Sequence, residues 1–118
     1  MKLESATLGP GQILITLDGR LDIAGAAEIE TTFSALVSHA QAALVDMAGV
    51  PFLASIGIRL ILVNAKGLYR RGGRLVLFGA DPQVEKVLLM TGVGELTTIV
   101  ATREEALAAI SATAGGAG

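Results

Sequence analysis

One stretch of the sequence decides the fold: residues 42–70, which read AALVDMAGVPFLASIGIRLILVNAKGLYR. The stretch opens with a short apolar run at residues 42–47, which indicates a central strand. Pro51 lies in the connection that follows, and because proline lacks a backbone N–H it argues against any regular element there. Ser55 then begins a helix that we expect to end near Tyr69. Apolar residues cover most of the circumference of that helix, so it is either largely buried or has an exposed face that meets a partner.

The sequence on either side of this stretch continues to alternate between strands and helices. We expect further strands at residues 3–8, 13–17, 75–78 and 96–100, and further helices at residues 28–39, 82–90 and 103–110. A Gly-Pro-Gly turn at residues 9–11 makes the first two strands a hairpin. The later strands are apolar runs, which is typical of parallel strands covered on both faces. The pattern therefore predicts a single α/β domain at residues 1–111 whose later strands are parallel, followed by a flexible tail at residues 112–118.

The composition excludes several classes of protein. The chain has 118 residues, of which 52% are hydrophobic and 17% are charged, and its mean hydropathy is +0.63. Intrinsically disordered proteins have low hydrophobicity and high charge, so this chain is expected to fold. Aromatic residues make up only 3%, the net charge is -2 and the pI is about 5.3. A nucleic-acid-binding protein normally has a basic surplus and aromatic side chains for stacking, so we expect no direct nucleic-acid partner.

The residues that support metal, thiol and membrane chemistry are also scarce. The chain has no cysteine, which excludes a thiol nucleophile, a disulfide and a Cys-type zinc site, and a lone histidine cannot build a multi-histidine metal site. We expect that histidine, His39, to be a partly exposed residue at a helix end. Residues 1–5 include an acid and no apolar segment, so they do not resemble a signal peptide. The longest apolar stretch, residues 56–65, is far shorter than the roughly 20 residues of a bilayer span. We therefore expect a cytoplasmic protein without membrane insertion.

Motifs of enzymatic catalysis are missing as well. No Gly-x-Gly-x-x-Gly follows a strand, and the glycines of residues 91–95 follow a helix and are best explained as a turn. A Ser-His-Asp system would need His39, which is remote from any serine elbow. One alternative stays open: Asp18, Asp22 and Asp46 could meet at the strand ends and hold Mg²⁺, although such aspartates commonly serve as turn and cap residues. The sequence thus predicts that the protein is not an enzyme and has no cofactor.

Ser55 is the most informative candidate residue. Its hydroxyl is expected at the positive end of a helix, where a phosphoryl group accepts backbone N–H bonds and is favoured by the helix dipole. A phosphate there brings nearly two negative charges to a weakly charged surface, which is enough to break an apolar interface beside it. The alternative is that Ser55 is a plain N-cap residue, which stabilises the helix by about 1 kcal/mol, and the residues alone favour the cap. Gly57 allows another segment to approach the helix backbone closely.

Four segments carry a family resemblance. Residues 46–59, DMAGVPFLASIGIR, resemble the central signature of STAS domains, and more narrowly that of bacterial anti-sigma factor antagonists. The other three resemble family motifs in the same order along the chain, and they are LDGRLD at residues 17–22, GGRLVL at residues 72–77 and VEKVLLMTG at residues 84–92. Each motif alone is weak, but four in order identify the family. The resemblance implies the STAS fold, an α/β domain with a mixed sheet of four to five strands flanked by about four helices.

The resemblance also implies an activity based on binding. Members of the family bind an anti-sigma factor that is also a serine kinase, and this releases a sigma factor for RNA polymerase. The kinase phosphorylates a serine that corresponds to Ser55, which ends the interaction, and a PP2C-type phosphatase resets it. The implied partner-binding residues are Asp22, Ala54, Ser55, Ile56, Gly57 and Arg59. The formation of a weak homodimer is left open.

The sequence departs from the family motif on both sides of Ser55. The family aspartate is replaced by Ala54 and the second family serine by Ile56, whereas the phosphoacceptor position is kept. A second hypothesis follows, in which the chain is a constitutive STAS interaction subunit of a stressosome-like assembly or of a lipid-transport ABC system. The apolar composition suits such a permanent interface nearly as well. For Asp22, the alternative to partner binding is the role of a turn residue that starts a helix.

Overall fold

The secondary structure follows the order that the sequence predicts. The computed structural model describes the backbone of residues 1–117 and the side chains of residues 1–111. The strands are β1 (Lys2–Gly9), β2 (Gln12–Asp18), β3 (Ala42–Gly49), β4 (Arg74–Phe78) and β5 (Thr97–Val100). The helices are α1 (Ile23–Ser38), α2 (Ser55–Arg70), α3 (Pro82–Met90), the short 3-10 helix η1 (Val93–Glu95) and α4 (Arg103–Ala117). All of these elements except η1 are expected from the sequence.

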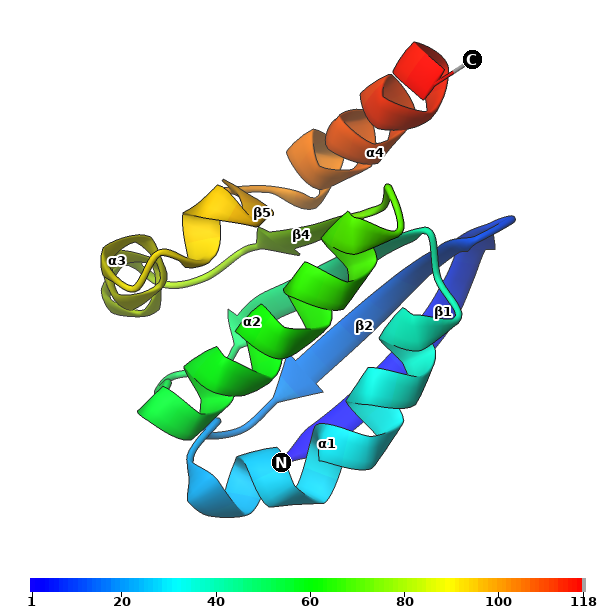
Figure 1. Ribbon diagram of the computed structural model, residues 1–118. Coiled ribbons are helices and arrows are strands. Elements are labelled where there is room, and N and C mark those ends of the chain that lie inside the picture. The colour runs from blue at the N-terminus through cyan, green and yellow to red at the C-terminus, as the bar shows by residue number, and fades with distance from the viewer. Residues whose placement is uncertain (118) are drawn as a thin grey trace.

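The five strands form a single mixed sheet in the order β1-β2-β3-β4-β5. β1 and β2 are antiparallel and form the predicted hairpin, whereas β2, β3, β4 and β5 pair in parallel with their neighbours. A helix lies in each connection between parallel strands, as this pairing requires. Because the carboxyl ends of β2 and β3 lie at the same edge of the sheet, the segments that lead from them to α1 and α2 meet there (Figure 1). These two segments contain Asp22 and Ala54.

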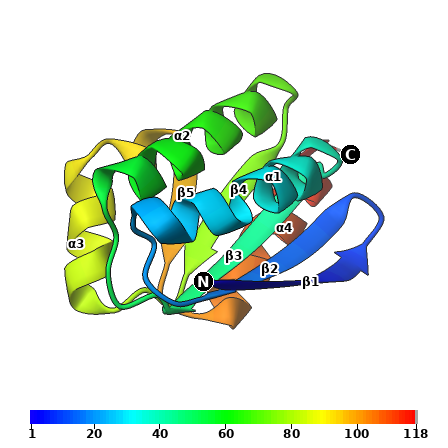
Figure 2. The ribbon, with the colours of Figure 1, turned by 90° about the horizontal axis from the view of Figure 1, so that it is seen from below.

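Helices cover both faces of the sheet. α1, α2 and α3 lie on one face, where α1 and α2 run side by side, and α4 lies on the other (Figure 1, Figure 2). The core of the first face includes Phe33 of α1, Leu60 of α2 and Leu77 of β4. The smaller core of the second face consists of Leu14, Leu44, Val76, Phe78, Ala106 and Ile110. β3 contributes to both cores and is buried on both sides, which confirms the interpretation of its apolar run.

α2 has one buried face and one exposed apolar face. Its buried residues are Gly57, Leu60, Ile61, Asn64, Ala65 and Leu68. The side-chain Nδ2 of Asn64 donates a hydrogen bond of 2.8 Å to the carbonyl oxygen of Leu60, which satisfies this buried donor within the helix. On the outer face, Val63 is 60% exposed and Ile56 is 38% exposed. One side of this helix is therefore buried and the other presents apolar side chains to solvent, and contact of that exposed face with a partner stays a prediction.

α4 begins as the sequence predicts but ends later. The N–H of Glu105 donates to Thr102 Oγ1 at 3.1 Å and the Thr102 hydroxyl donates to Glu105 Oε1 at 3.1 Å, so Thr102 and Glu105 have the spacing and the first bond of a capping box. The helix ends at Ala117 and so includes most of the segment expected as a tail. The expected flexibility of residues 112–118 stays a prediction, and residue 118 lies outside the described residues.

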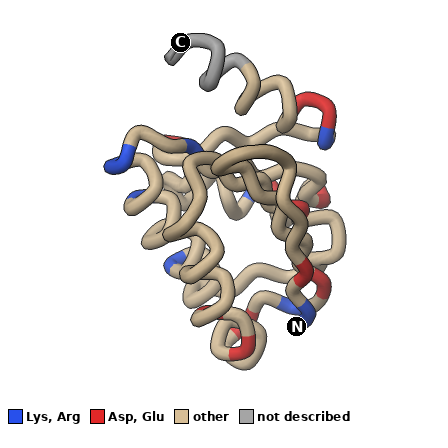
Figure 3. The backbone as a smooth tube through the Cα atoms, turned by 90° about the vertical axis from the view of Figure 1, so that its right-hand side faces the viewer, with Lys and Arg blue, Asp and Glu red and all other residues tan. Residues whose placement is uncertain are grey.

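Charged residues are sparse along the chain. Figure 3 shows them scattered over the backbone, with long uncharged stretches between them. Among the helices within residues 1–117, none combines the length and the apolar character needed to cross a bilayer. A single charge added to this surface, or removed from it, therefore changes the local electrostatic potential with few neighbouring charges to offset it.

Candidate functional site

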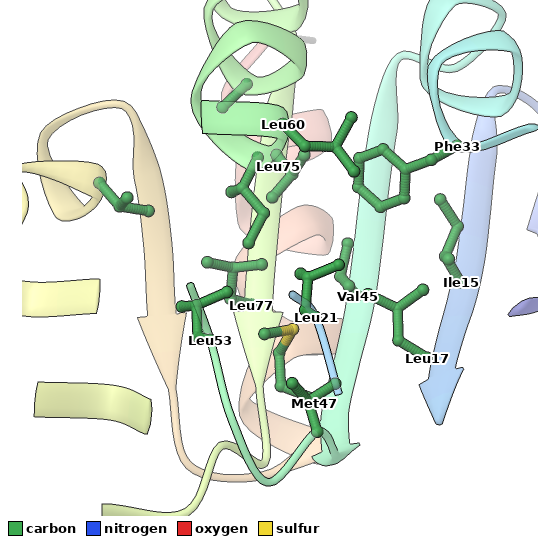
Figure 4. Packing of buried hydrophobic residues seen from close by; sticks show 14 of the residues in the cluster. Ile15, Leu17, Leu21, Phe33, Val45, Met47, Leu53, Leu60, Leu75 and Leu77 are labelled. Carbon is green, nitrogen blue, oxygen red and sulfur yellow. The ribbon is translucent and has the colours of Figure 1, made fainter. Parts of the chain in front are cut away.

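Backbone hydrogen bonds join the loop before α1 to the loop before α2. Leu21 and Leu53 form an isolated parallel bridge. The Leu21 N–H donates to the Phe52 carbonyl oxygen at 3.0 Å, and the Ala54 N–H donates to the Leu21 carbonyl oxygen at 3.0 Å. Both leucine side chains are buried and belong to the same core as Met47 (Figure 4). The bridge brings the first loop to the start of α2, as the family resemblance implies.

Gly57 makes this close approach possible. A Cβ atom built on Gly57 would lie 2.6 Å from Leu21 Cγ, 2.8 Å from the Leu21 carbonyl oxygen and 3.0 Å from Leu53 Cδ1. Contacts this short overlap the atomic radii, so only glycine fits here without displacing the bridge. The first turn of α2 therefore packs directly on the two leucines, which confirms the predicted close approach at Gly57.

Ser55 is the first residue of α2 and not its N-cap. The N-cap is Ala54, whose backbone is extended at φ -92 and ψ 168, and whose carbonyl oxygen accepts from the N–H groups of Gly57 and Ile58. The N-cap role predicted as the alternative for Ser55 is therefore wrong. The physical reason is the bond from the Ala54 N–H to Leu21, which holds Ala54 as the last extended residue before the helix.

The hydroxyl and the backbone N–H of Ser55 have no partner in the part of the chain that the structure describes. Its hydroxyl makes no hydrogen bond there, and neither do the backbone N–H groups of Ser55 and Ile56. The first N–H groups of any helix lack partners within the helix, so they are left to water or to an anion. Because Ser55 is exposed, this small cluster of polar groups opens to solvent.

Asp22 is the N-cap of α1. Its Oδ1 accepts a hydrogen bond of 2.8 Å from the Gly25 N–H, and its Oδ2 lies 3.5 Å from Arg20 Nε. The hydrogen bond from Gly25 is the main cause that lowers the pKa of Asp22 below its ordinary value, and Arg20 adds to the effect. The predicted role of Asp22 as a residue that starts a helix is thus confirmed, and its side chain lies in the loop that contacts Ala54.

Exposed apolar side chains surround Ser55. Ile23 is 77% exposed and Phe52 is 40% exposed. A hollow of about 620 Å³ at the start of α2 is lined by Ile23, Ala54, Ser55, Ile56 and Arg59. We define the Ser55 surface as Asp22, Ile23, Phe52, Ala54, Ser55, Ile56 and Arg59. Such a patch, apolar with few polar groups, is typical of a surface that binds another protein.

All predicted partner-binding residues except Gly57 lie on the Ser55 surface, and Gly57 is buried beneath it. Sequence reasoning missed Ile23 and Phe52, because an apolar residue beside a loop is usually part of the core and only its exposure shows otherwise. It also missed Arg20, whose guanidinium carbon lies 4.3 Å from the centroid of the Phe52 ring and so stacks on it. The one signal that could have found Arg20 is its place in the LDGRLD motif.

A second hollow lies between α1 and α2. It measures about 300 Å³ and is lined by Glu30, Ser34, Ile56, Arg59, Leu60, Val63 and Asn64. We call it the α1–α2 hollow. Ile56 and Arg59 line both this hollow and the one beside Ser55, so the two are adjacent along the outer face of α2.

The remaining candidates do not form a site. Within residues 1–117, no three His, Asp or Glu side chains gather as a metal ion would require, so the alternative of Asp18, Asp22 and Asp46 holding Mg²⁺ is wrong. Asp46 instead accepts a hydrogen bond from the Ala48 N–H at 2.9 Å. His39 is an exposed residue at the C-cap of α1, as predicted.

Comparison with known proteins assigns the family. The family model described as STAS domain matches residues 5–106. A curated relative is BtrV of Bordetella bronchiseptica, provisionally named an anti-sigma factor antagonist, which is 30% identical over 84% of this chain and 86% of its own. An anti-sigma factor antagonist domain protein from Planctomyces limnophilus is similar in structure, with a TM-score of 0.81, 26% identity and coverage of 92% of this chain and 96% of that one.

The anti-sigma factor antagonist SpoIIAA has the same fold. Its unphosphorylated form matches with a TM-score of 0.73 and 21% identity over 93% of this chain and 98% of that one. Its phosphorylated form, from Bacillus, matches with a TM-score of 0.71 and 22% identity over 92% of this chain and 99% of that one. The family model and the curated relative span most of this chain, and the chain therefore belongs to the STAS domain family, among the anti-sigma factor antagonists.

Proposed function

We propose that this protein binds a kinase-type anti-sigma factor through the Ser55 surface, which releases a sigma factor, and that phosphorylation of Ser55 ends the binding. The observation that carries the proposal is the state of Ser55. Its hydroxyl is exposed and lacks a hydrogen-bond partner within the described residues, yet it lies among exposed apolar side chains. A serine with no structural bond of its own is free to act as a phosphoacceptor.

A phosphoryl group on Ser55 would oppose binding at this surface. The kinase would transfer the γ-phosphoryl group of ATP to Ser55 Oγ, with release of ADP and of the hydroxyl proton. The product carries nearly two negative charges beside Ile23 and Ile56, and burying these charges against an apolar partner is costly. The free N–H groups of Ser55 and Ile56 would hold the group at the helix start, so the modified state is itself stable. A PP2C-type phosphatase would restore the hydroxyl by hydrolysis.

The replacement of the family aspartate by Ala54 does not remove the basis for this switch. The Ser55 hydroxyl is positioned by the backbone, because the Ala54 N–H is bonded to Leu21 and the Ala54 carbonyl oxygen to the first turn of α2. No neighbouring carboxylate is needed for that geometry. The phosphorylated form of SpoIIAA supports the proposal by its fold and by the modification that its description names.

The proposal is tested by measuring the affinity for a kinase-type anti-sigma factor from the same organism by calorimetry. We expect Ser55→Ala to bind like the unmodified protein, and Ser55→Glu to bind at least about tenfold more weakly. Ser111→Glu is the matched control, because it adds the same charge on α4, across the sheet from the Ser55 surface. Mass spectrometry after incubation with the kinase and ATP should find the phosphate on Ser55.

Two results would contradict the switch. One is an unchanged affinity in Ser55→Glu, and the other is a protein that the kinase leaves unmodified at Ser55. Co-purification with a transporter or a stressosome-like scaffold, together with absence of phosphate, would instead favour the constitutive STAS subunit.

A further inference from the structure

Arg59 lies one helical turn after Ser55 on the same face of α2. Residues four positions apart in a helix are neighbours on its surface. Accordingly, Ser55 and Arg59 both line the hollow at the start of α2. Arg59 also lines the α1–α2 hollow, together with Glu30. Its side chain is therefore placed between the phosphoacceptor and the groove beside it.

Arg59 differs from the other cation of this region in having no fixed partner. Arg20 is engaged twice, since its Nε lies 3.5 Å from Asp22 Oδ2 and its guanidinium stacks on Phe52 at 4.3 Å. The Arg59 side chain makes no ion pair, hydrogen bond or ring contact within the described part of the chain, and Glu30 is not paired with it. An unpaired guanidinium among apolar side chains is suited to an acidic group from outside, because it offers several N–H donors in a rigid plane.

We propose that Arg59 reads the phosphorylation state of Ser55, an inference that rests on the proposed function. When the Ser55 hydroxyl is free, Arg59 pairs with a carboxylate of the anti-sigma factor at the centre of the interface. When Ser55 is phosphorylated, Arg59 pairs with the phosphoryl oxygens of its own chain. Phosphorylation then weakens binding in two ways, because it adds negative charge to the surface and withdraws the cation that the partner needs.

This mechanism differs measurably from repulsion by the phosphate alone. If only repulsion acts, phosphorylation lowers the affinity by the same factor whether or not Arg59 is present. If Arg59 is captured, part of the loss has already occurred in a variant without it, and phosphorylation costs that variant less. The effects of phosphorylating Ser55 and of replacing Arg59 on the affinity are then coupled, and a double-mutant cycle measures this coupling.

The experiment compares the unaltered protein, Arg59→Gln and Lys66→Gln, each with and without phosphoserine installed at position 55 by genetic encoding. Lys66 is the matched control, because it is an exposed cation on the same helix and loses the same charge. We expect Arg59→Gln to weaken binding of the anti-sigma factor about tenfold, and phosphorylation to cost this variant about tenfold less affinity than it costs the unaltered protein. Lys66→Gln should change both quantities by less than about twofold.

A second measurement needs no partner. Phosphorus NMR follows the second ionisation of the phosphoserine, which Arg59 should shift to lower pH by favouring the dianion. We expect this ionisation at higher pH in Arg59→Gln than in the unaltered protein or in Lys66→Gln. The inference is overturned if Arg59→Gln binds as tightly as the unaltered protein, if phosphorylation costs both the same factor, or if their phosphoserines ionise at the same pH. Undiminished binding by the phosphorylated unaltered protein would instead refute the proposed function.

Discussion

The backbone N–H of Ala54 donates a hydrogen bond of 3.0 Å to the carbonyl oxygen of Leu21. This bond holds Ala54 in the extended conformation and makes it the N-cap of α2. It therefore releases the Ser55 hydroxyl from the capping role that serine usually takes. Together with the bond from the Leu21 N–H to the Phe52 carbonyl oxygen, it ties the loop of Asp22 to the start of α2 and so brings together the two segments of the Ser55 surface.

The stability of the protein should not depend on the Ser55 hydroxyl. Because the hydroxyl makes no hydrogen bond within the described residues, we expect Ser55→Ala to change the free energy of unfolding by less than about 0.5 kcal/mol. Asp81→Ala is the contrasting variant, since Asp81 Oδ1 accepts from the Val84 N–H at 2.9 Å as the N-cap of α3. Its loss should cost about 1 kcal/mol. Urea denaturation measures both, and equal losses in the two variants would contradict the assignment of Ala54 as the cap.

Gly57→Ala should destabilise the protein. The added methyl group would overlap Leu21 and Leu53 in the bridge, and we expect a loss of about 1–3 kcal/mol in the free energy of unfolding. Gly67 is the matched control on the same helix, because a Cβ there meets only Arg71 Nη1 at 3.7 Å. Gly67→Ala should stabilise the protein by about 0.5–1 kcal/mol through the higher helix propensity of alanine. Chemical denaturation measures the free energy of unfolding of both variants. Similar values would mean that Leu21 and Leu53 shift at little cost to accommodate the added methyl group.

Asp22 should make the stability depend on pH in the acid range. The pKa of Asp22 is lowered in the folded protein by the Gly25 N–H and by Arg20, so its carboxylate stabilises the fold above the unfolded pKa of about 4. This contribution is lost as the pH falls from about 4 through the lower pKa of the folded state. Asp22→Asn keeps a good capping residue without the charge. We expect its melting temperature to be below that of the unaltered protein near neutral pH and to approach it in acid. A difference in melting temperature that stays the same at every pH would contradict a contribution from the Asp22 charge.

Exposed apolar residues of the Ser55 surface should matter for binding and not for folding. Ile23 is 77% exposed, so Ile23→Ser should leave the melting temperature nearly unchanged and should weaken binding of the anti-sigma factor at least about fivefold. Met90 on α3 is 75% exposed and lines a different hollow, which makes Met90→Ser the matched control. Calorimetric titration of both variants gives the comparison. If Met90→Ser lost more affinity than Ile23→Ser, the partner-binding surface would be assigned to α3 instead.

The order of the elements and several of their ends follow from the sequence because they are local. The capping residue Asp81 and the proline after it mark the start of α3 within a few positions, and the apolar run of residues 42–47 marks β3. Periodicity and caps depend on residues a few positions apart, so the chain specifies them without its tertiary contacts. The same is true of the capping box that begins α4 at Thr102. Four short motifs in order were also sufficient to indicate the family.

Only the tertiary structure showed that Ser55 is not the cap of α2 and which residues are exposed around it. The residues around Ser55, taken without the family resemblance, favoured a capping serine. The bond from Ala54 to Leu21 joins two segments far apart in the chain through backbone atoms, which every residue has, so no local sequence pattern predicts it. The side chains of Ile23 and Phe52 are exposed in the folded chain, which their local sequence does not predict. The sequence by itself thus determined which segments become helices and strands, whereas long-range packing determined which side chains are free to meet a partner.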